Sequence, residues 1–132
     1  DIVMVLRAFP IRVPGNSGPL AKEISWEQLT NESGSIKPIS EFTSVTKTVR
    51  RVAHFDPEIV KSALRANRPT RVMLNHVDYF DRSPELVAGQ LTAKMLLAAQ
   101  TLEREVGASI HYLGTSPVHL VVNAEIKAFK RA

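Results

Sequence analysis

Short apolar runs alternate with helix-like segments along the chain. Residues 2–6 are a continuous apolar run rich in β-branched side chains, which is typical of a buried strand. Residues 71–79 begin as a second buried strand and end in polar groups. Residues 110–113 are predicted to form a third short strand. Residues 118–122 are predicted to form a further strand or a segment that runs back along the third strand. Strands that alternate with helices predict an α/β fold with an open, largely parallel sheet and flanking helices.

Two longer helices are predicted between these strands. The first begins at the N-cap Asp56 and Pro57 and ends at Asn67. The second begins at 83–85, runs to about residue 105 and stops at Gly107. A shorter capping pattern, Ser25 followed by Gln28, predicts one helical turn. Residues 14–19 and 30–40 are rich in turn residues and predict surface loops, and 123–132 predicts a fraying terminal segment.

Residues 41–56 form an unusual polar stretch without glycine or proline. It holds four hydroxyl side chains, a lysine and two adjacent arginines (Thr43, Ser44, Thr46, Thr48, Lys47, Arg50 and Arg51). Hydroxyls, backbone N–H groups and guanidinium forks favour a carboxylate or a phosphate. We expect an anion-binding loop whose far end is anchored by the helix that follows.

Two further polar segments follow predicted strands. Asn75-His76-Val77-Asp78 ends the second strand, and a turn over 114–117 follows the third. Open α/β sheets bind ligands at the carboxyl ends of their strands. We therefore expect these segments and the 43–51 loop to meet at one edge of the sheet. The Asn75–Asp78 segment is similar to the Asn-Lys-x-Asp motif with which GTP-binding proteins recognise guanine, with histidine in place of lysine.

Composition narrows the class of protein. At 132 residues the chain fits one domain, and its formal net charge of +4 is too spread out to favour a nucleic-acid surface. It has no cysteine, no secretory pattern and no apolar run long enough for a bilayer, so we expect a cytoplasmic protein without membrane contact.

Common catalytic motifs are absent from the sequence. It has no GxxxxGK[ST] phosphate loop, no GxGxxG, no HExxH and no GxSxG, and its four histidines lack metal-ligand spacing. Its carboxylates form no obvious acid/base pair. The chain thus carries binding features, no metal site and no self-contained catalytic set.

Four of these segments, in order, resemble the C-terminal part of adenylosuccinate synthetase. Arg12-Val13 with the turn at 15–19 is similar to the family's Arg-Val-Gly-x-Gly-Pro segment, and 41–56 resembles its Glu-Phe-Gly-x-Thr-Thr-Gly-Arg-x-Arg-Arg loop. Residues 75–81 resemble its Thr-Lys-Leu-Asp-x-Leu-Asp strand end, and 107–117 its Gly-x-x-Ile and Ser-Thr-Gly-Pro pair. Four ordered motifs are far more specific than one.

The resemblance implies a ligase that joins IMP, or a related purine monophosphate, to L-aspartate at the expense of GTP. Residues 1–132 would be its C-terminal lobe, part of a larger P-loop-like nucleotide-binding fold that assembles as a homodimer and needs no nucleic acid. Mg²⁺ would sit on the phosphates, with its ligands outside this segment. The phosphate loop, catalytic aspartate and catalytic histidine of the family precede the matched segment, so we expect the chain alone to be inactive.

Residue roles follow from the resemblance, position by position. Thr46 and the backbone at Val45 would hold the aspartate carboxylates, and Val13 would pack against the purine monophosphate. Thr48 stands in place of an arginine, which leaves the carboxylate to be held by Lys47 or by the backbone alone. The implied substrate-binding residues are Val13, Val45, Thr46, Lys47, Thr48 and Arg50.

The resemblance implies that the base of the donor nucleotide is bound by the segments at 75–78 and 114–117. Asp78 would accept from the guanine ring, His76 would stack near the base in place of a lysine, and the turn at 114–117 would close over it. The implied nucleotide-binding residues are Arg50, His76, Asp78, Gly114, Thr115 and Ser116.

The substitutions indicate a divergent or compact branch, archaeal-like or phage-like. Phage forms start from dGMP, so the purine substrate stays open between IMP and a dGMP-like nucleotide. Two other functions remain: a non-catalytic nucleotide- or anion-binding module, and, with less support, a nucleic-acid-binding domain. The basic stretches at 47–51 and 65–71 lack the interleaved aromatic residues of single-strand binders.

Overall fold

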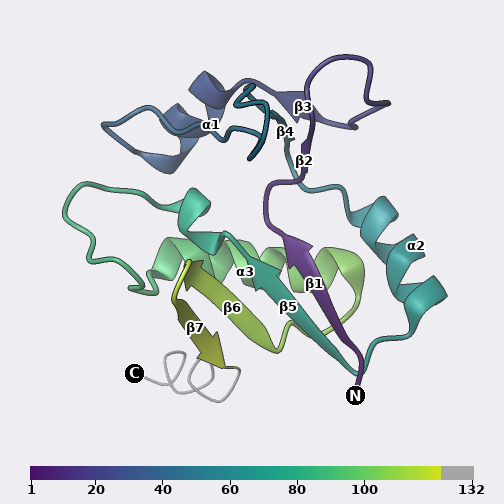
Figure 1. Cartoon of the computed structure of the whole chain (residues 1–132). Helices are drawn as coiled ribbons and strands as arrows, with labels where there is room; N and C mark the ends of the chain where they lie inside the picture. Colours follow the sequence, from purple (N-terminus) through teal and green to yellow (C-terminus); the bar gives the residue numbers. More distant parts are fainter. Residues whose placement is uncertain (123–132) are drawn as a thin grey trace.

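The computed structural model describes residues 1–122 and contains two layers (Figure 1). A four-stranded sheet with one long helix forms the lower layer, and a small three-stranded sheet with a short helix lies above the carboxyl ends of its parallel strands. The upper layer therefore covers the edge at which the sequence placed its polar segments.

The lower sheet has the strand order β1-β5-β6-β7. Its strands are β1 (Val3–Arg7), β5 (Arg71–Asn75), β6 (Tyr112–Ser116) and β7 (His119–Val122). β1, β5 and β6 are parallel, with Met4 opposite Val72 and Leu74 opposite Leu113, and β7 returns antiparallel to β6. The predicted fold class is confirmed.

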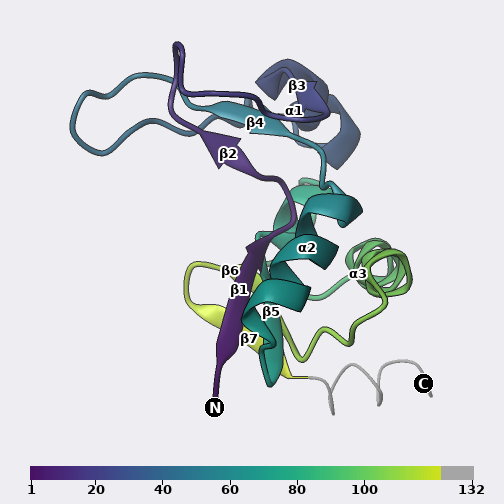
Figure 2. The ribbon, with the colours of Figure 1, turned by 90° about the vertical axis from the view of Figure 1, so that its right-hand side faces the viewer.

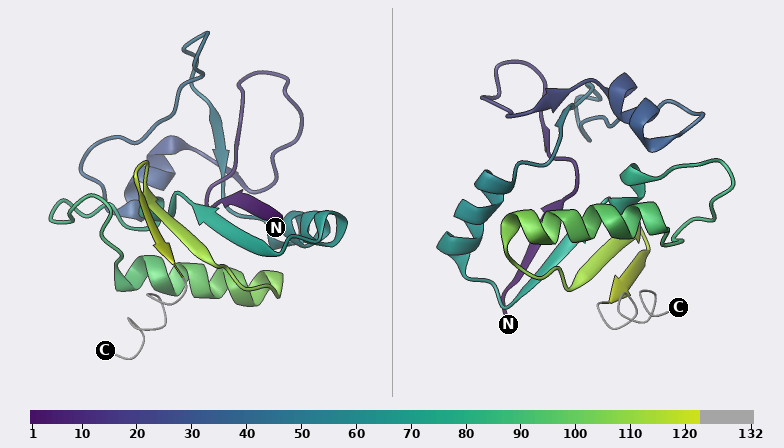
Figure 3. Two further views of the ribbon diagram at one scale, coloured as in Figure 1. Left: turned by 60° about the horizontal axis from the view of Figure 1, so that its bottom comes forward. Right: turned by 180° about the vertical axis from the view of Figure 1, so that it is seen from behind.

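A hydrophobic core lies between one face of this sheet and helix α3 (Ala93–Val106). Val72, Leu74 and Leu113 project from the sheet into the core, where they meet the buried side of α3. Seen from the side and from behind, α3 runs across this face (Figures 2 and 3). Met95, Ala99, Leu102 and Val106 lie on the buried side of α3, at the spacing of an amphipathic helix.

The opposite face of the sheet is not covered by a helix within residues 1–122 (Figure 2). Val3 and Val5 lie on it at 48% and 57% exposure, beside Met73. The prediction that residues 2–6 form a buried strand is wrong for this face, because β1 is an edge strand that packs on one side only.

Helix α2 (Pro57–Asn67) matches its predicted bounds. The Asp56 side chain accepts a hydrogen bond from the Glu58 N–H, and Arg68 ends the helix with a left-handed backbone. The capping residues were sufficient to predict the bounds of this helix, because a cap forms its hydrogen bonds within the neighbouring turn and needs no distant partner.

Helix α3 begins at Ala93, about eight residues later than predicted. Thr92 is its N-cap and accepts from the Met95 N–H, whereas residues 83–92 form a loop. Asp81 holds both ends of this loop by accepting hydrogen bonds from the hydroxyls of Ser83 and Thr92. Gly89 adopts φ +84°, which a helix excludes.

The upper layer is built on β2 (Ile11–Arg12), β4 (Arg51–Ala53), β3 (Glu23–Ile24) and α1 (Trp26–Ser33). β4 pairs antiparallel with both β2 and β3. Ser25 caps α1 as predicted, but the helix spans two turns and ends at Gly34. The predicted terminal segment at 123–132 lies outside the described residues.

Replacing Thr92 with alanine tests the start of α3. T92A removes the N-cap and the hydrogen bond to Asp81, so the free energy of unfolding should fall by about 1–2 kcal/mol. Chemical denaturation measures the loss. T101A is the matched control in the middle of the same helix, and a T92A loss no larger than that of T101A would contradict the assignment.

Candidate functional site

The polar stretch at 41–50 folds into a hairpin that projects from the upper layer. Phe42 pairs with Val49, the Thr43 N–H donates to the Thr48 carbonyl at 2.9 Å, and the Arg50 N–H donates to the Glu41 carbonyl at 2.8 Å. β4, and not helix α2, follows the hairpin directly. The expectation that the helix anchors its far end is therefore wrong, since pairing of β4 with β2 and β3 does so.

The tip of the hairpin carries three hydroxyls that touch one another. The Oγ1 atoms of Thr43, Thr46 and Thr48 lie 2.6 to 3.1 Å apart, and the Thr48 N–H also donates to Thr43. Lys47 takes the left-handed φ of +55° and is exposed at the tip. The hydroxyls are thus gathered at one place, while the lysine stands apart from them.

A first cleft, of about 380 Å³, lies between this hairpin and the end of β2. Its lining residues are Val13, Pro14, Thr43, Ser44, Val45, Thr46, Thr48 and Arg50. It contains every substrate-binding residue expected from the sequence except Lys47. We call it the hairpin cleft.

Arg50 is the cation of the hairpin cleft. Its backbone is fixed, because its carbonyl accepts from Trp26 Nε1 at 2.6 Å and its N–H bonds Glu41. Its side chain forms no ion pair within residues 1–122, and its buried Nε has no hydrogen-bond partner there. Since an unpaired buried donor is costly, this guanidinium is suited to a ligand acceptor.

A second cleft, of about 710 Å³, lies below the hairpin between the 35–39 loop, the 83–90 loop and the end of β6. Asp78, Arg82, Thr115 and Ser116 are among its lining residues. Three of the expected nucleotide-binding residues are thus brought together from segments almost forty positions apart. We call it the strand-end cleft.

Gly114, Thr115 and Ser116 extend β6, so the predicted turn over 114–117 is displaced to Pro117 and Val118. Gly114 does not line the strand-end cleft. A Cβ built on it would lie 2.2 Å from Asn75 Oδ1, so glycine here allows close packing between two strands. Buried Thr115 donates to the Gly89 carbonyl at 2.9 Å and so ties the 83–92 loop to the sheet.

His76 points away from the strand-end cleft. It has a left-handed backbone, with φ +62°, at the start of the 3₁₀ turn η1 (Val77–Phe80), and its Nε2 lies 2.8 Å from Arg7 Nη1. Arginine can only donate, so Nε2 accepts and the ring is neutral. The placement expected for His76, beside the donor base, differs from this one because the positive φ turns its side chain towards β1.

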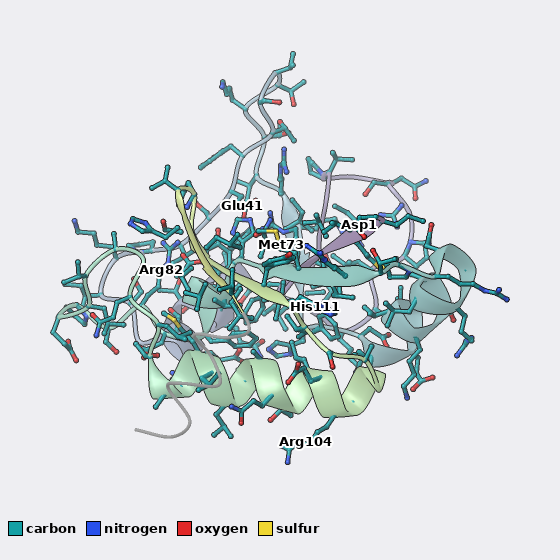
Figure 4. All side chains as sticks on the ribbon, turned by 90° about the horizontal axis from the view of Figure 1, so that it is seen from below. Asp1, Glu41, Met73, Arg82, Arg104 and His111 are labelled. Atoms are coloured by element: carbon teal, nitrogen blue, oxygen red, sulfur yellow. The ribbon has the colours of Figure 1, made fainter. Side chains whose placement is uncertain are left out.

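A half-buried carboxylate, that of Glu41 (labelled in Figure 4), joins the hairpin to the sheet. It forms an ion pair with Arg7 at the end of β1 and accepts from the Tyr79 hydroxyl at 2.7 Å. Burial raises the pKa of Glu41, but the hydrogen bonds from Tyr79 and Arg7 outweigh burial and hold that pKa below its ordinary value. Burial and the bond to Glu41 raise the pKa of Tyr79, so the phenol stays protonated.

Sequence reasoning missed Glu41, Tyr79, Arg7 and Arg82 as site residues. Arg82 donates through Nε and Nη2 to Asp78 Oδ2, at 3.2 and 2.5 Å. Its spacing of four residues from Asp78 was the available signal. No comparable signal connected Glu41 with Tyr79, which is 38 positions away.

The described residues do not fit a Mg²⁺ site. Between residues 1 and 122 no three carboxylate or imidazole side chains gather as metal ligands, so we assign no step to a metal. In the same range no helix has the length and apolarity of a membrane span.

The known proteins that resemble this chain are purine nucleotide synthetases. The chain is 34% identical over 119 residues to N6-succino-2-amino-2'-deoxyadenylate synthase of Vibrio phage phiVC8, across 88% of the chain and 31% of that protein. It is 29% identical to adenylosuccinate synthetase of Methanocaldococcus jannaschii, across 89% of the chain and 32% of that protein. The chain is homologous to part of the adenylosuccinate synthetases. No protein-family model matches it.

Solved structures confirm the fold. Succinoaminodeoxyadenylate synthetase of cyanophage S-2L, bound to dGMP and to dATP as an energy donor, superposes with a TM-score of 0.66 at 23% identity, over 96% of this chain and 36% of that one. Fully ligated adenylosuccinate synthetase of Plasmodium falciparum gives 0.71 at 14% identity, over 93% and 40%. The chain spans about a third of the length of its curated relatives. The resemblance predicted from four motifs is confirmed.

Replacing His76 with asparagine tests its neutral state. Burial, with the nearby Arg7 charge, lowers the pKa of His76 below the ordinary 6.5. The unfolded chain therefore binds the proton more readily, and stability should fall as pH decreases from 6.5 through the folded pKa. Asparagine tolerates the left-handed backbone, so H76N should flatten this slope in urea unfolding between pH 7 and 5. Equal slopes for both proteins would contradict the prediction.

Proposed function

We propose that this chain is the substrate- and donor-binding lobe of a cytoplasmic ligase that joins a purine nucleoside monophosphate to L-aspartate. A purine nucleoside triphosphate, GTP in the sequence prediction, would be the energy donor. One observation carries the proposal. Five of the residues assigned to the substrates line the hairpin cleft, and three of those assigned to the donor line the strand-end cleft, at the carboxyl end of β6.

The hairpin cleft has the chemistry for L-aspartate. Three hydroxyls and the backbone N–H groups at the tip are donors for a carboxylate, and Arg50 supplies a charge that has no ion-pair partner within residues 1–122. Thr48 stands where an arginine was expected, so the carboxylate would be held by hydroxyls and by Arg50. Lys47 does not line the cleft.

The purine monophosphate would lie against Val13 in the same cleft. Its apolar side chain is 55% exposed and lies beside Pro14, which gives the purine a surface to pack on. The phage phiVC8 relative is named for a 2-amino-2'-deoxyadenylate product, and the archaeal relative for adenylosuccinate. Both IMP and dGMP are therefore candidate substrates.

The domain organisation is part of the proposal. Residues 1–132 would form one lobe of a longer, homodimeric enzyme, with the Mg²⁺ ligands and catalytic side chains supplied by other segments. Two observations support this: the chain matches about a third of its relatives, and the sheet face with Val3, Val5 and Met73 is apolar and open. Further protein packed on that face would bury it.

The isolated 132-residue chain should bind ligands without turnover. Mixed with IMP or dGMP, with GTP or ATP, and with Mg²⁺ and L-aspartate, it should give no succinyl nucleotide by liquid chromatography, because it lacks a phosphate loop. Product formed in proportion to the amount of pure chain would overturn the assignment as a dependent lobe.

Replacing Arg50 tests the hairpin cleft. Trp26 is the only tryptophan, and it bonds the Arg50 carbonyl, so its fluorescence reports binding there. R50A keeps this backbone bond and should weaken L-aspartate and purine monophosphate binding about tenfold, as expected for loss of a charged hydrogen bond.

R65A is the matched control, because Arg65 is exposed on α2 and, within residues 1–122, its side chain hydrogen-bonds only to Ser62. Its affinities should equal those of the unaltered chain. The proposal fails if R50A and R65A bind alike. It also fails if an oligonucleotide binds instead, with affinity that falls steeply between two salt concentrations.

A further inference from the structure

The guanidinium of Arg7, at the carboxyl end of β1, contacts three different segments. Its Nε donates to the Phe9 carbonyl at 3.2 Å, its Nη1 lies 2.8 Å from His76 Nε2, and its Nη2 donates to a carboxylate oxygen of Glu41. Each of the three nitrogens therefore has a partner of its own. The side chains of Arg7 and Glu41 are only 26% and 19% exposed, so water screens their attraction only in part.

Two of these segments lead into the two walls of the hairpin cleft. Phe9 lies in the connection from β1 to β2, and the chain beyond β2 supplies Val13 to one wall. Glu41 begins the hairpin that forms the other wall, and its carbonyl accepts from the Arg50 N–H at 2.8 Å. Arg7 therefore fixes the supports of both walls, although it does not line the cleft itself.

The third contact of Arg7, with His76, exists only while the imidazole is neutral. Arginine can only donate, so a proton on Nε2 would remove the acceptor and place a second cation beside Arg7. Burial and the charge of Arg7 outweigh the attraction of two nearby carboxylates, and the pKa of His76 lies below the ordinary 6.5. The other titratable or charged groups near the ring are Tyr79, Glu41, Asp78 and Arg82.

We propose that Arg7 is a positioning residue that holds the two walls of the hairpin cleft at the spacing L-aspartate needs, and that its contact with His76 makes this spacing depend on pH. The proposal rests on the function proposed above, in which the hairpin cleft binds L-aspartate. Arg7 acts through Glu41 and through the connection from β1 to β2, and it does not touch the ligand. A lysine would put one nitrogen in place of three that each reach a different segment.

The test measures L-aspartate binding to the ¹⁵N-labelled 132-residue chain at pH 7.5 and at pH 5.5, at fixed ionic strength. The amide shifts of Thr46 and Thr48 report occupancy, because both residues line the hairpin cleft. L-aspartate keeps nearly the same charge over this range, so a change in affinity arises in the protein. We expect binding to the unaltered chain to weaken about threefold at pH 5.5, because His76 gains a proton and its contact with Arg7 is lost.

Two variants separate the geometry of the guanidinium from its charge. R7K keeps a positive charge beside Glu41, and it should weaken L-aspartate binding about tenfold at pH 7.5, as for loss of a charged hydrogen bond. Because the ammonium would stay on Glu41, the remaining affinity should no longer depend on pH. H76N tolerates the left-handed backbone and has no proton to gain, so it should abolish the pH dependence as well.

E41Q tests the same link from the side of the hairpin. It removes the charge that pairs with Arg7 and keeps the length of the side chain, so it should weaken L-aspartate binding at pH 7.5 in the same direction as R7K. It also replaces R7K if that variant fails to fold, which circular dichroism at each pH reveals. R104A, on the outer side of α3 (Figure 4), should keep both the affinity and the pH dependence of the unaltered chain.

Each result decides one assignment. If R7K and E41Q bind L-aspartate as tightly as R104A does, the positioning role of Arg7 is overturned, even where R7K lowers stability. If H76N keeps the pH dependence of the unaltered chain, the link through His76 is overturned. Both results leave L-aspartate in the hairpin cleft. Absence of any shift with L-aspartate in the unaltered chain overturns the assignment of the cleft, and the role of Arg7 with it.

Discussion

The half-buried carboxylate of Glu41 is the constraint on which the rest of the site depends. A carboxylate partly removed from water needs a charge partner and hydrogen bonds, and Glu41 obtains them from two other elements, Arg7 at the end of β1 and Tyr79 in η1. Because Glu41 also opens the hairpin and accepts from the Arg50 N–H, the hairpin is fixed relative to the parallel sheet. The upper layer and the sheet edge are thereby joined by one charged group.

The contacts of Glu41 with Arg7 and Tyr79 position the side chains that line both clefts. On one side, the hairpin gathers the threonine hydroxyls near Arg50. On the other, Tyr79 presents its ring to Arg82, which in turn holds Asp78. The hydrogen bond between Tyr79 and Glu41 therefore connects the base of the hairpin with the 3₁₀ turn that carries Asp78.

Local signals predicted the elements whose determinants lie within a few residues. Asp56 with Pro57 and Ser25 each begin a helix as expected, and Gly107 ends one, because a cap satisfies backbone groups one turn away. The start of α3 was wrong because Ser83 and Thr92 are both good caps, and the choice between them depends on Asp81 and on the φ of Gly89. The burial of residues 2–6 was wrong in part because strand composition does not reveal whether a neighbour covers each face.

The sequence by itself determined the order of the motifs, the α/β class and the chemical groups available for binding, since these depend on residue type and spacing. The resemblance grouped Thr46 and Thr48 with Arg50 as substrate-binding residues and Asp78 with Thr115 as donor-binding residues, and each group lines one cleft. The hairpin cleft contains no residue of the four-stranded sheet, so the polar segments do not share one cleft as expected. Only the tertiary structure decided where each polar side chain points. A positive φ turned His76 towards Arg7, Asn75 packed over Gly114, and Arg82 took up one oxygen of Asp78. The direction of these side chains is set by partners that the fold brings together, and residue spacing along the chain does not encode such partners.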